Sequence, residues 1–169
     1  EVLGLGTNPG LAFFKSQEAA QSPLPLAGTV LLTVAVRDRI ATGAGSPGAN
    51  VLSAARTFVR CGMTLLATEG TQRFLAEHGI AAEAVLKLHE GHPNLADAIA
   101  DGGVQLVVNT PAGASSEYDD SYIRKAAIRA RVPYVTTTSE ALAAAQGIAA
   151  RLAGAAAVRS LQSYHAMIR

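Results

Sequence analysis

Runs of consecutive apolar residues alternate along the chain with segments whose apolar residues recur at helical spacing. The run at 29–36, TVLLTVAV, is rich in β-branched residues and predicts a central β-strand. Shorter runs predict four further strands, at 63–68, 83–88, 104–110 and 133–138. Continuous apolar strands separated by helices are typical of a parallel sheet covered on both faces. The pattern predicts an α/β fold: a three-layer, Rossmann-like α/β/α arrangement around a mainly parallel sheet of five strands.

Helices are predicted between the strands. Residues 50–61 have helical spacing with Asn50 as N-cap, after a glycine-rich stretch at 41–50 that predicts a loop. The alanine-rich stretch at 141–158 predicts a buried helix capped by Ser139, because its apolarity is too weak for a membrane span. The remaining predicted helices cover residues 71–78, 94–102 and 120–130.

The first 25 residues follow a different pattern from the rest. A turn-rich start leads into LAFFKSQEAAQ, which predicts an amphipathic helix anchored by Leu11, Phe14 and Ala19, and a proline-rich linker follows. We therefore expect residues 1–25 to be a connection from an upstream domain and residues 26–169 to form the domain proper.

Composition narrows the class of protein. A length of 169 residues predicts one domain. Charged residues make up 16% of the chain, against roughly 25% in average soluble domains, and the net charge is +1, so no strong field attracts nucleic acid or a membrane. A single cysteine, Cys61, excludes an intrachain disulfide framework. The chain begins at Glu1 without a secretory signal, and we expect a cytoplasmic piece of a larger protein.

Polar residues follow the predicted strands, whose carboxyl ends should share one edge of the sheet. The sequence Thr68-Glu69-Gly70-Thr71 joins a strand to the next helix, where free N–H groups, a glycine and two hydroxyls favour phosphate binding. Ordinary helix capping by these threonines is the alternative interpretation.

Two cations and an amide lie at other strand ends. Lys87 is flanked by leucines and would offer a point charge to a phosphate, although a lysine at the surface of an edge strand is an equal alternative. Arg39 is a second cation, and Asn109 is suited to hydrogen-bond a sugar or a base. Phosphate- or nucleotide-binding groups thus follow several strands.

Two other polar clusters are weaker candidates for a binding site. His89, Glu90 and His92 lack the spacing of a helical zinc site, so we expect loop contacts and no metal centre. Asp119 and Asp120 begin a predicted helix, where capping is the default and a ligand role for Asp119 is the weaker alternative.

The order VLLTVAVRD, LLATEGT, LKLHEGHP, VVNT and PYVTTT resembles the methylglyoxal-synthase-like domain family. Within it, the similarity is greatest to the C-terminal allosteric domains of carbamoyl-phosphate synthase large subunits. The leader EVLGLGTNPGLAFFKSQEAA resembles the end of their second ATP-grasp synthetase unit, and YHAMIR resembles their terminus. The similarity therefore covers nearly the whole chain.

The resemblance implies a regulatory nucleotide-binding domain that has no catalytic residues, metal or cofactor of its own. It implies inhibition by uridine monophosphate (UMP) and activation by inosine monophosphate (IMP) at one site, and activation by ornithine. The implied nucleotide and phosphate contacts are Thr33, Arg39, Thr68, Thr71, Lys87, Asn109 and Asp119. The implied ornithine contacts are Tyr134 and Thr136.

The resemblance also implies a larger enzyme. Its synthetase domains, together with a small glutaminase subunit, would make carbamoyl phosphate for pyrimidine and arginine biosynthesis, using ATP, magnesium or manganese, and potassium. Self-association is a further expectation.

Three positions depart from the family pattern. Arg39 replaces a lysine, Pro111 replaces a threonine that contacts ligand, and the loop Ile40–Gly48 is longer by about nine residues. These changes predict altered nucleotide sensitivity.

Three alternatives remain. A methylglyoxal synthase-type lyase would need aspartates where this chain has His92 and Thr110, while Asp97 falls inside a predicted helix. An inosine-monophosphate cyclohydrolase domain disagrees with the leader and the tail. A structural oligomerisation domain that has lost its ligand agrees with the long loop and Pro111.

Overall fold

The computed structural model describes residues 1–111, 117–154 and 158–167. A parallel sheet runs through this part of the chain, with its five strands in the order β3-β2-β1-β4-β5. The strands are β1 (Thr29–Thr33), β2 (Thr64–Thr68), β3 (Glu83–Val85), β4 (Leu106–Asn109) and β5 (Tyr134–Val135). The predicted α/β fold with a five-stranded parallel sheet is confirmed.

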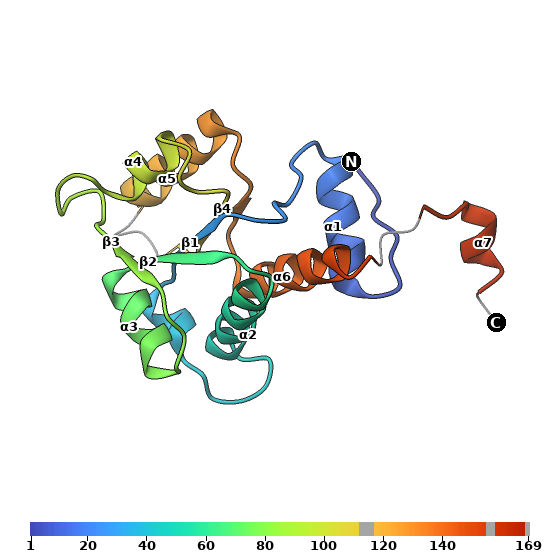
Figure 1. The fold of residues 1–169 in the computed structure, drawn as a ribbon, viewed down its shortest axis with the longest axis horizontal. Coiled ribbons are helices and arrows are strands. Elements are labelled where there is room, and N and C mark those ends of the chain that lie inside the picture. The colour runs from blue at the N-terminus through green and yellow to red at the C-terminus, as the bar shows by residue number, and fades with distance from the viewer. Residues whose placement is uncertain (112–116, 155–157, 168–169) are drawn as a thin grey trace.

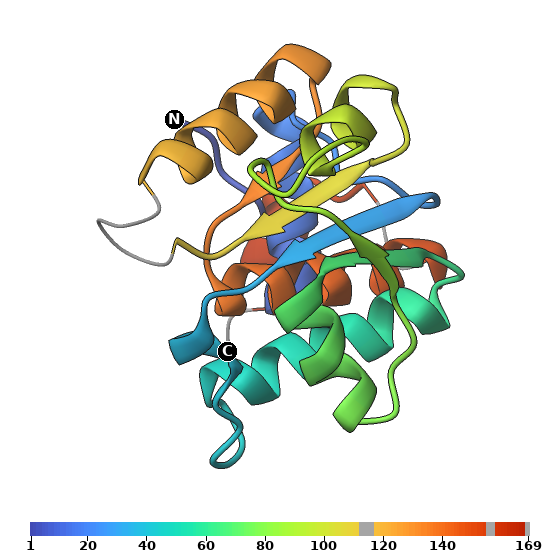
Figure 2. The ribbon, with the colours of Figure 1, turned by 90° about the vertical axis from the view of Figure 1, so that its left-hand side faces the viewer.

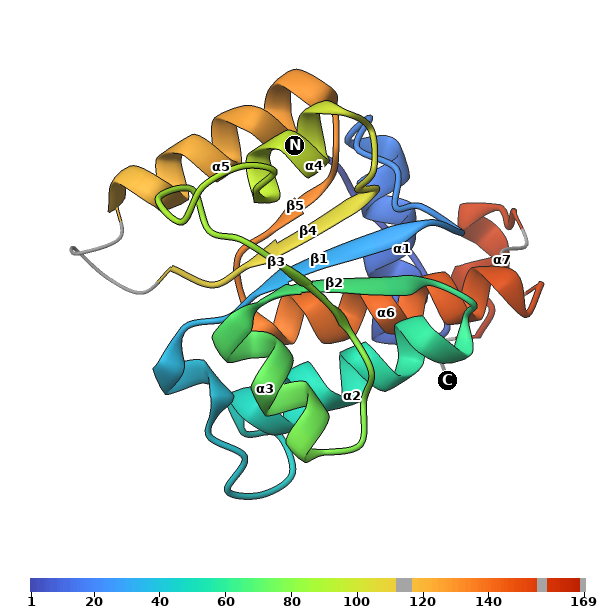
Figure 3. The same cartoon turned by 60° about the vertical axis from the view of Figure 1, so that its left-hand side comes forward.

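Helices cover both faces of the sheet (Figure 1). One layer contains α2, α3 and α6, and the opposite layer contains α4 and α5 (Figure 3). The helices are α1 (Pro9–Ala19), α2 (Pro47–Arg60), α3 (Glu69–Glu77), α4 (Leu95–Ala100), α5 (Glu117–Ala130), α6 (Thr138–Leu152), α7 (Leu161–His165) and the 3-10 helix η1 (Val36–Arg39). Over the described ranges, every helix is too short or too polar to cross a bilayer.

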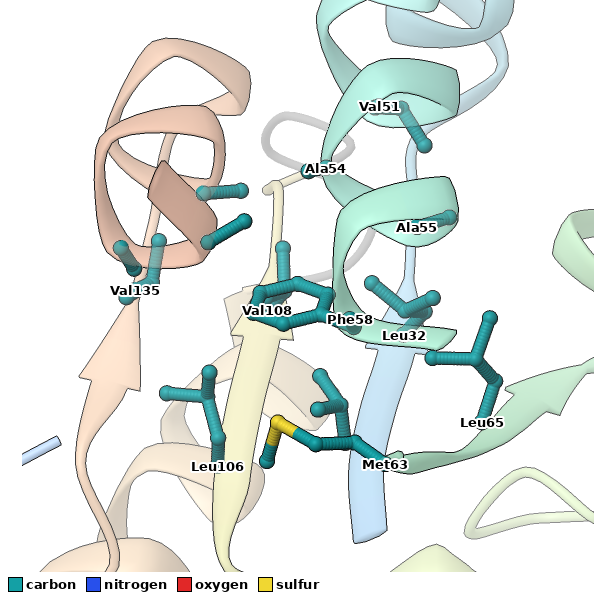
Figure 4. Close-up of a cluster of buried hydrophobic side chains, with 14 of the residues drawn as sticks. Leu32, Val51, Ala54, Ala55, Phe58, Met63, Leu65, Leu106, Val108 and Val135 are labelled. Atoms are coloured by element: carbon teal, nitrogen blue, oxygen red, sulfur yellow. The ribbon is translucent and has the colours of Figure 1, made fainter. Parts of the chain in front are cut away.

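The central strands are apolar on both faces because each face has its own core. On the α2 and α6 side, Phe58 packs against Leu106, Val108 and Met63 (Figure 4). On the other side, Leu31 belongs to a second buried cluster, which α4 and α5 complete. Covering both faces explains the uninterrupted apolar runs of the sequence.

The leader helix α1 packs on α6 rather than standing apart from the domain. Cβ atoms added at Gly10 and Gly147 would come within 2.6 Å of Gln146 Cβ and 2.5 Å of the Gly10 carbonyl oxygen, so the two glycines allow a close helix crossing. Phe14 joins the larger buried cluster, as predicted, but Ala19 is exposed, so its predicted anchoring role is wrong.

Several element boundaries differ from those predicted. Helix α2 begins at Pro47, because Ser46 is its N-cap and accepts a hydrogen bond from the Ala49 amide, so Asn50 is not the cap. Thr137, rather than Ser139, caps α6. Residues 112–116 of the predicted loop before α5 and residues 155–157 of the predicted long helix lie outside the described residues.

The strand order places a switch point between β1 and β4. From β1 the chain first builds outward through β2 to β3, and then returns to the other side of β1 for β4 and β5. The loops after β1 and β4 leave the sheet at the same edge (Figure 2), and Thr33 pairs in register with Asn109 there. In open parallel sheets, ligands bind in the crevice at such a point.

Candidate functional site: a polar pocket at the carboxyl edge

A pocket of about 320 Å³ lies at the carboxyl edge of the sheet, within the roughly 300–1,000 Å³ typical of small-molecule sites. It brings together all seven residues predicted to contact nucleotide or phosphate, which come from the ends of three strands, the first turns of two helices and the segments that follow β1 and β3. These are Thr33, Arg39, Thr68, Thr71, Lys87, Asn109 and Asp119. Lining the pocket is a matter of position, and binding by these residues stays a prediction.

The N-terminus of α3 opens into this pocket without a side-chain cap. Thr68 occupies its N-cap position, yet its hydroxyl accepts no bond from the first turn. By contrast, the N-cap side chains of α1, α2, α4, α6 and α7 all accept such bonds. The first-turn amides of Gly70 and Thr71 have no partner within the helix, so they are available to an anion.

Thr71 is oriented by the buried hydrogen bonds that its hydroxyl oxygen accepts. The Val34 amide donates to Thr71 Oγ1 at 3.0 Å, and the Thr68 hydroxyl donates to the same atom at 3.4 Å. Since a hydroxyl has two acceptor lone pairs and one proton, the proton of Thr71 is left to donate elsewhere. The structure therefore makes Thr71 a hydrogen-bond donor at the α3 terminus.

Arg39 supplies a cation beside the same helix terminus. Its Nη1 donates to the Gly70 carbonyl at 2.6 Å, while its buried Nε has no hydrogen-bond partner among the described residues. Burial, and secondarily the charge of Arg73, lowers the pKa of Arg39. A Cβ at position 70 would lie 2.7 Å from Arg39 Nη1, so glycine leaves room for the guanidinium. A bound anion would accept a hydrogen bond from Arg39 Nε. It would also offset the repulsion between the charges of Arg39 and Arg73.

Lys87 also lines the pocket, although it lies beyond the end of β3 rather than on a strand as predicted. Its Nζ is 3.9 Å from the Glu90 carboxylate, and 46% of its side chain is exposed. The ammonium group is thus loosely held and close to solvent.

Hydrogen-bonding groups at the end of β4 and the start of α5 line another part of the pocket. Asn109 Nδ2 donates to Asp120 Oδ1 at 2.9 Å and to the Tyr134 hydroxyl at 2.6 Å. With both amide hydrogens used, the Asn109 side-chain oxygen remains as an acceptor. The pocket therefore pairs a phosphate-type end with an end suited to a polar organic group.

The two residues predicted to contact ornithine do not line the pocket. The Tyr134 hydroxyl accepts a hydrogen bond from Asn109, which lines the pocket, and Arg124 lies over the Tyr134 ring at 5.6 Å. Burial of the phenol raises the pKa of Tyr134. The Thr136 amide donates to Glu140 at 3.0 Å. These residues lie behind the pocket wall, where β5 ends.

Sequence reasoning missed three polar lining residues. Thr110 accepts a hydrogen bond from the Ala35 amide at 2.8 Å, and thereby ties together the loops that follow β1 and β4. His89 pairs with Asp119 at 3.5 Å, and Asp120 holds Asn109. The sequence placed Thr110 at the end of a strand and gave Asp119 as a ligand contact, but it began the following helix at residue 120, whereas α5 begins at Glu117.

Of the cluster His89, Glu90 and His92, His89 lines the pocket, whereas Glu90, His92 and the long loop do not. His92 contacts Asp97 at 2.6 Å, and Asp97 closes a capping box with Asn94. The Asn94 amide, more than His92, lowers the pKa of Asp97. Among the described residues, no group of three or more histidine, cysteine or acidic side chains is placed to hold a metal. Residues 40–48 do not line the pocket.

The strand order and the pocket at the β1–β4 switch point define an α/β domain with a polar ligand site. Residues 50–136 match the family model described as the MGS-like domain, so the chain belongs to the MGS-like domain family. This confirms the family resemblance seen in the sequence.

Curated relatives carry a similar sequence within a much longer chain. The carbamoyl phosphate synthase large chain of Gemmatimonas aurantiaca is 44% identical over 169 residues, which are 100% of this chain and 15% of that relative. The large chain of Mesorhizobium japonicum is 45% identical over 98% of this chain and 14% of its own. The C-terminal section of the Methanopyrus kandleri large chain is 42% identical over 88% of this chain and 26% of its own. The chain thus spans between 14% and 26% of the length of these relatives.

Proposed function

We propose that this chain is the regulatory nucleotide-binding domain of a carbamoyl phosphate synthase large chain, and that its pocket holds the phosphate of a nucleoside monophosphate. Family membership and the named relatives support the first part. The pocket chemistry supports the second.

One observation carries the proposal: among the described residues, three kinds of unsatisfied hydrogen-bond donor lie together at the N-terminus of α3. They are the uncapped first-turn amides, the proton of Thr71 and the buried Nε of Arg39. Lys87 adds a positive charge on the same pocket. Donors of this kind favour a dianionic phosphate, because charge-assisted hydrogen bonds are about twice as strong as neutral ones.

The far end of the pocket would hold the nucleoside. The Asn109 oxygen accepts hydrogen bonds, and Asp119 offers a carboxylate to hydroxyl groups. We propose UMP as inhibitor and IMP as activator at this one site. Ornithine would bind separately at Tyr134 and Thr136, with its remaining contacts on the preceding synthetase domain.

Regulation would proceed by population shift. A nucleotide that binds one arrangement of the domain better than another changes the affinity of the synthetase for ATP by a coupling of about 1–3 kcal/mol. Carbamoyl phosphate synthesis itself, with its ATP, magnesium or manganese, potassium and glutaminase subunit, would belong to the parent enzyme in the cytoplasm. The pathways served would be those of pyrimidines and arginine.

Calorimetric titration of the chain with UMP and IMP tests the proposal. Each should bind one site per chain, and saturation with one should abolish the heat of binding of the other. Additive binding of both would contradict a shared site, and the absence of any binding would favour a structural oligomerisation domain.

A lyase of the methylglyoxal synthase type remains the second candidate, because two carboxylates, Asp119 and Asp120, line the pocket. Asp119 pairs with His89, and Asp120 is engaged by Asn109. Release of inorganic phosphate from dihydroxyacetone phosphate, lost in Asp119→Asn, would establish this activity in place of regulation.

A further inference from the structure

The position of Lys87 in the pocket is not set by the sheet. Strand β3 ends at Val85, and the next residue, Leu86, forms an isolated bridge with Asn94. The Leu95 amide donates to the Leu86 carbonyl at 3.0 Å. The loop that carries Lys87 is therefore closed at its base, and contacts inside the loop decide where Lys87 lies.

Glu90 makes three of those contacts. Its carboxylate oxygen Oε2 accepts a hydrogen bond from the Lys87 amide at 2.7 Å. The Glu90 amide donates to the Lys87 carbonyl at 3.1 Å, which closes a tight turn. The second carboxylate oxygen, Oε1, lies 3.9 Å from Lys87 Nζ. One side chain thus holds the backbone of Lys87 and also faces its charge.

Glu90 and Lys87 face different hollows of the surface. Lys87 lines the polar pocket, whereas Glu90 lines a neighbouring groove together with Leu66 and Pro93. The carboxylate therefore draws the ammonium group toward the groove, and an anion in the pocket would draw it the other way. Because the pair is partly exposed, this competition is modest in size.

We propose that Glu90 is a positioning residue for Lys87 which also competes with the bound anion for its ammonium group. The backbone contact presents Lys87 to the pocket, and the charge contact limits how tightly the pocket holds phosphate. This inference rests on the proposed anion site and assigns the regulation of its affinity to a residue outside the pocket.

Two substitutions separate the roles. Glu90→Gln keeps an oxygen acceptor for the Lys87 amide and removes the competing charge, whereas Glu90→Ala removes both. Glu83→Gln is the matched control, because Glu83 is an exposed carboxylate on β3, the strand that leads into this loop, and its loss changes the net charge equally. Lys87→Ala combined with Glu90→Gln closes a double-mutant cycle.

The experiment titrates each variant of the chain with inorganic phosphate and follows the amide resonance of Thr71. Glu90→Gln should bind phosphate about two- to fivefold more tightly than the unmodified chain, and Glu83→Gln should change affinity less. Glu90→Gln should not raise the affinity for phosphate when Lys87 is also replaced by alanine. Glu90→Ala should raise this affinity less than Glu90→Gln does. Unchanged or weaker binding by Glu90→Gln, or a gain that persists without Lys87, would overturn the competition.

Hydrogen exchange of the Lys87 amide tests the positioning role without any ligand. Exchange should be slow in the unmodified chain and in Glu90→Gln, and faster in Glu90→Ala. Equal rates in all three would overturn this role. If the unmodified chain binds no phosphate, the proposed function fails, and the exchange rates still decide whether Glu90 positions Lys87.

Discussion

The hydroxyl oxygen of Thr71, on the first turn of α3, accepts a hydrogen bond from the buried Val34 amide just beyond β1, at 3.0 Å. This bond fixes the loop after β1 to the helix that forms the floor of the proposed phosphate site. It also directs the Thr71 proton away from the protein backbone, where it can meet a ligand. The Thr71 side chain therefore both stabilises the fold at the switch point and offers a hydrogen-bond donor to a ligand there.

Replacing Thr71 with valine should lower both the stability of the fold and the affinity of the site for nucleotide. The buried Val34 amide would lose its acceptor, so the free energy of unfolding should fall by about 1–3 kcal/mol. Affinity for UMP should fall as well, because a donor is lost. Urea denaturation and calorimetric titration measure the two effects, and Thr71→Ser, which keeps the hydroxyl, should restore most of both. A valine variant with unchanged stability and affinity would contradict the assigned role.

Removal of the Lys87 side chain should affect binding and leave folding intact. Lys87→Ala should weaken UMP binding about tenfold or more, because a charged hydrogen-bond donor to phosphate is lost. The thermal midpoint should hardly change, since the lysine side chain is half exposed. Lys125→Ala, on an exposed part of α5, is the matched control and should bind like the unmodified chain. Equal UMP affinity in the two variants would remove Lys87 from the site.

Tyr134 predicts a pH dependence of stability. Burial raises the pKa of its phenol above the ordinary value of about 10, so the folded state favours the protonated form. This contribution is fully present below the unfolded-state pKa and is lost as the pH rises through the folded-state pKa. The stability of the unmodified chain relative to Tyr134→Phe should therefore decline above about pH 10. Denaturation curves from pH 7 to 11 that stay parallel would show that the phenol does not titrate differently on folding.

The crossing of α1 and α6 predicts that the leader stabilises the domain. Gly147→Ala would place a methyl group 2.5 Å from the Gly10 carbonyl, which forces the helices apart. We expect a loss of about 1–3 kcal/mol in the free energy of unfolding, as for other overpacked sites. Gln146→Ala, an exposed neighbour on the same helix, is the control and should change stability little. No loss in Gly147→Ala would mean that α1 contributes little to folding.

The sequence predicted the sheet well, because its signal is physical and strong. Val30, Leu31 and Leu32 are buried on alternate faces, and only a strand covered on both sides tolerates such a run. The same logic placed Thr68 and Asn109 at strand ends, where the sheet order then brought them into one pocket. Convergence at the carboxyl edge follows from parallel topology alone.

Boundaries and fine contacts were less predictable. Ser46 and Pro47 form a capping signal for α2 that the surrounding glycines obscured. The missing cap of α3 could not be foreseen either, because Thr68 is a good N-cap residue whose hydroxyl is diverted to Thr71 by tertiary packing. Likewise, the pairing of Glu90 with Lys87 depends on a turn that no periodicity in the sequence indicates.

The most direct test of the phosphate site compares UMP with uridine, which lacks only the phosphate. In a two-dimensional amide NMR titration, UMP should shift the resonances of Gly70 and Thr71 at the α3 terminus, and uridine at the same concentration should leave them in place. Equal shifts with both ligands, or UMP shifts confined to residues away from α3, would contradict the account.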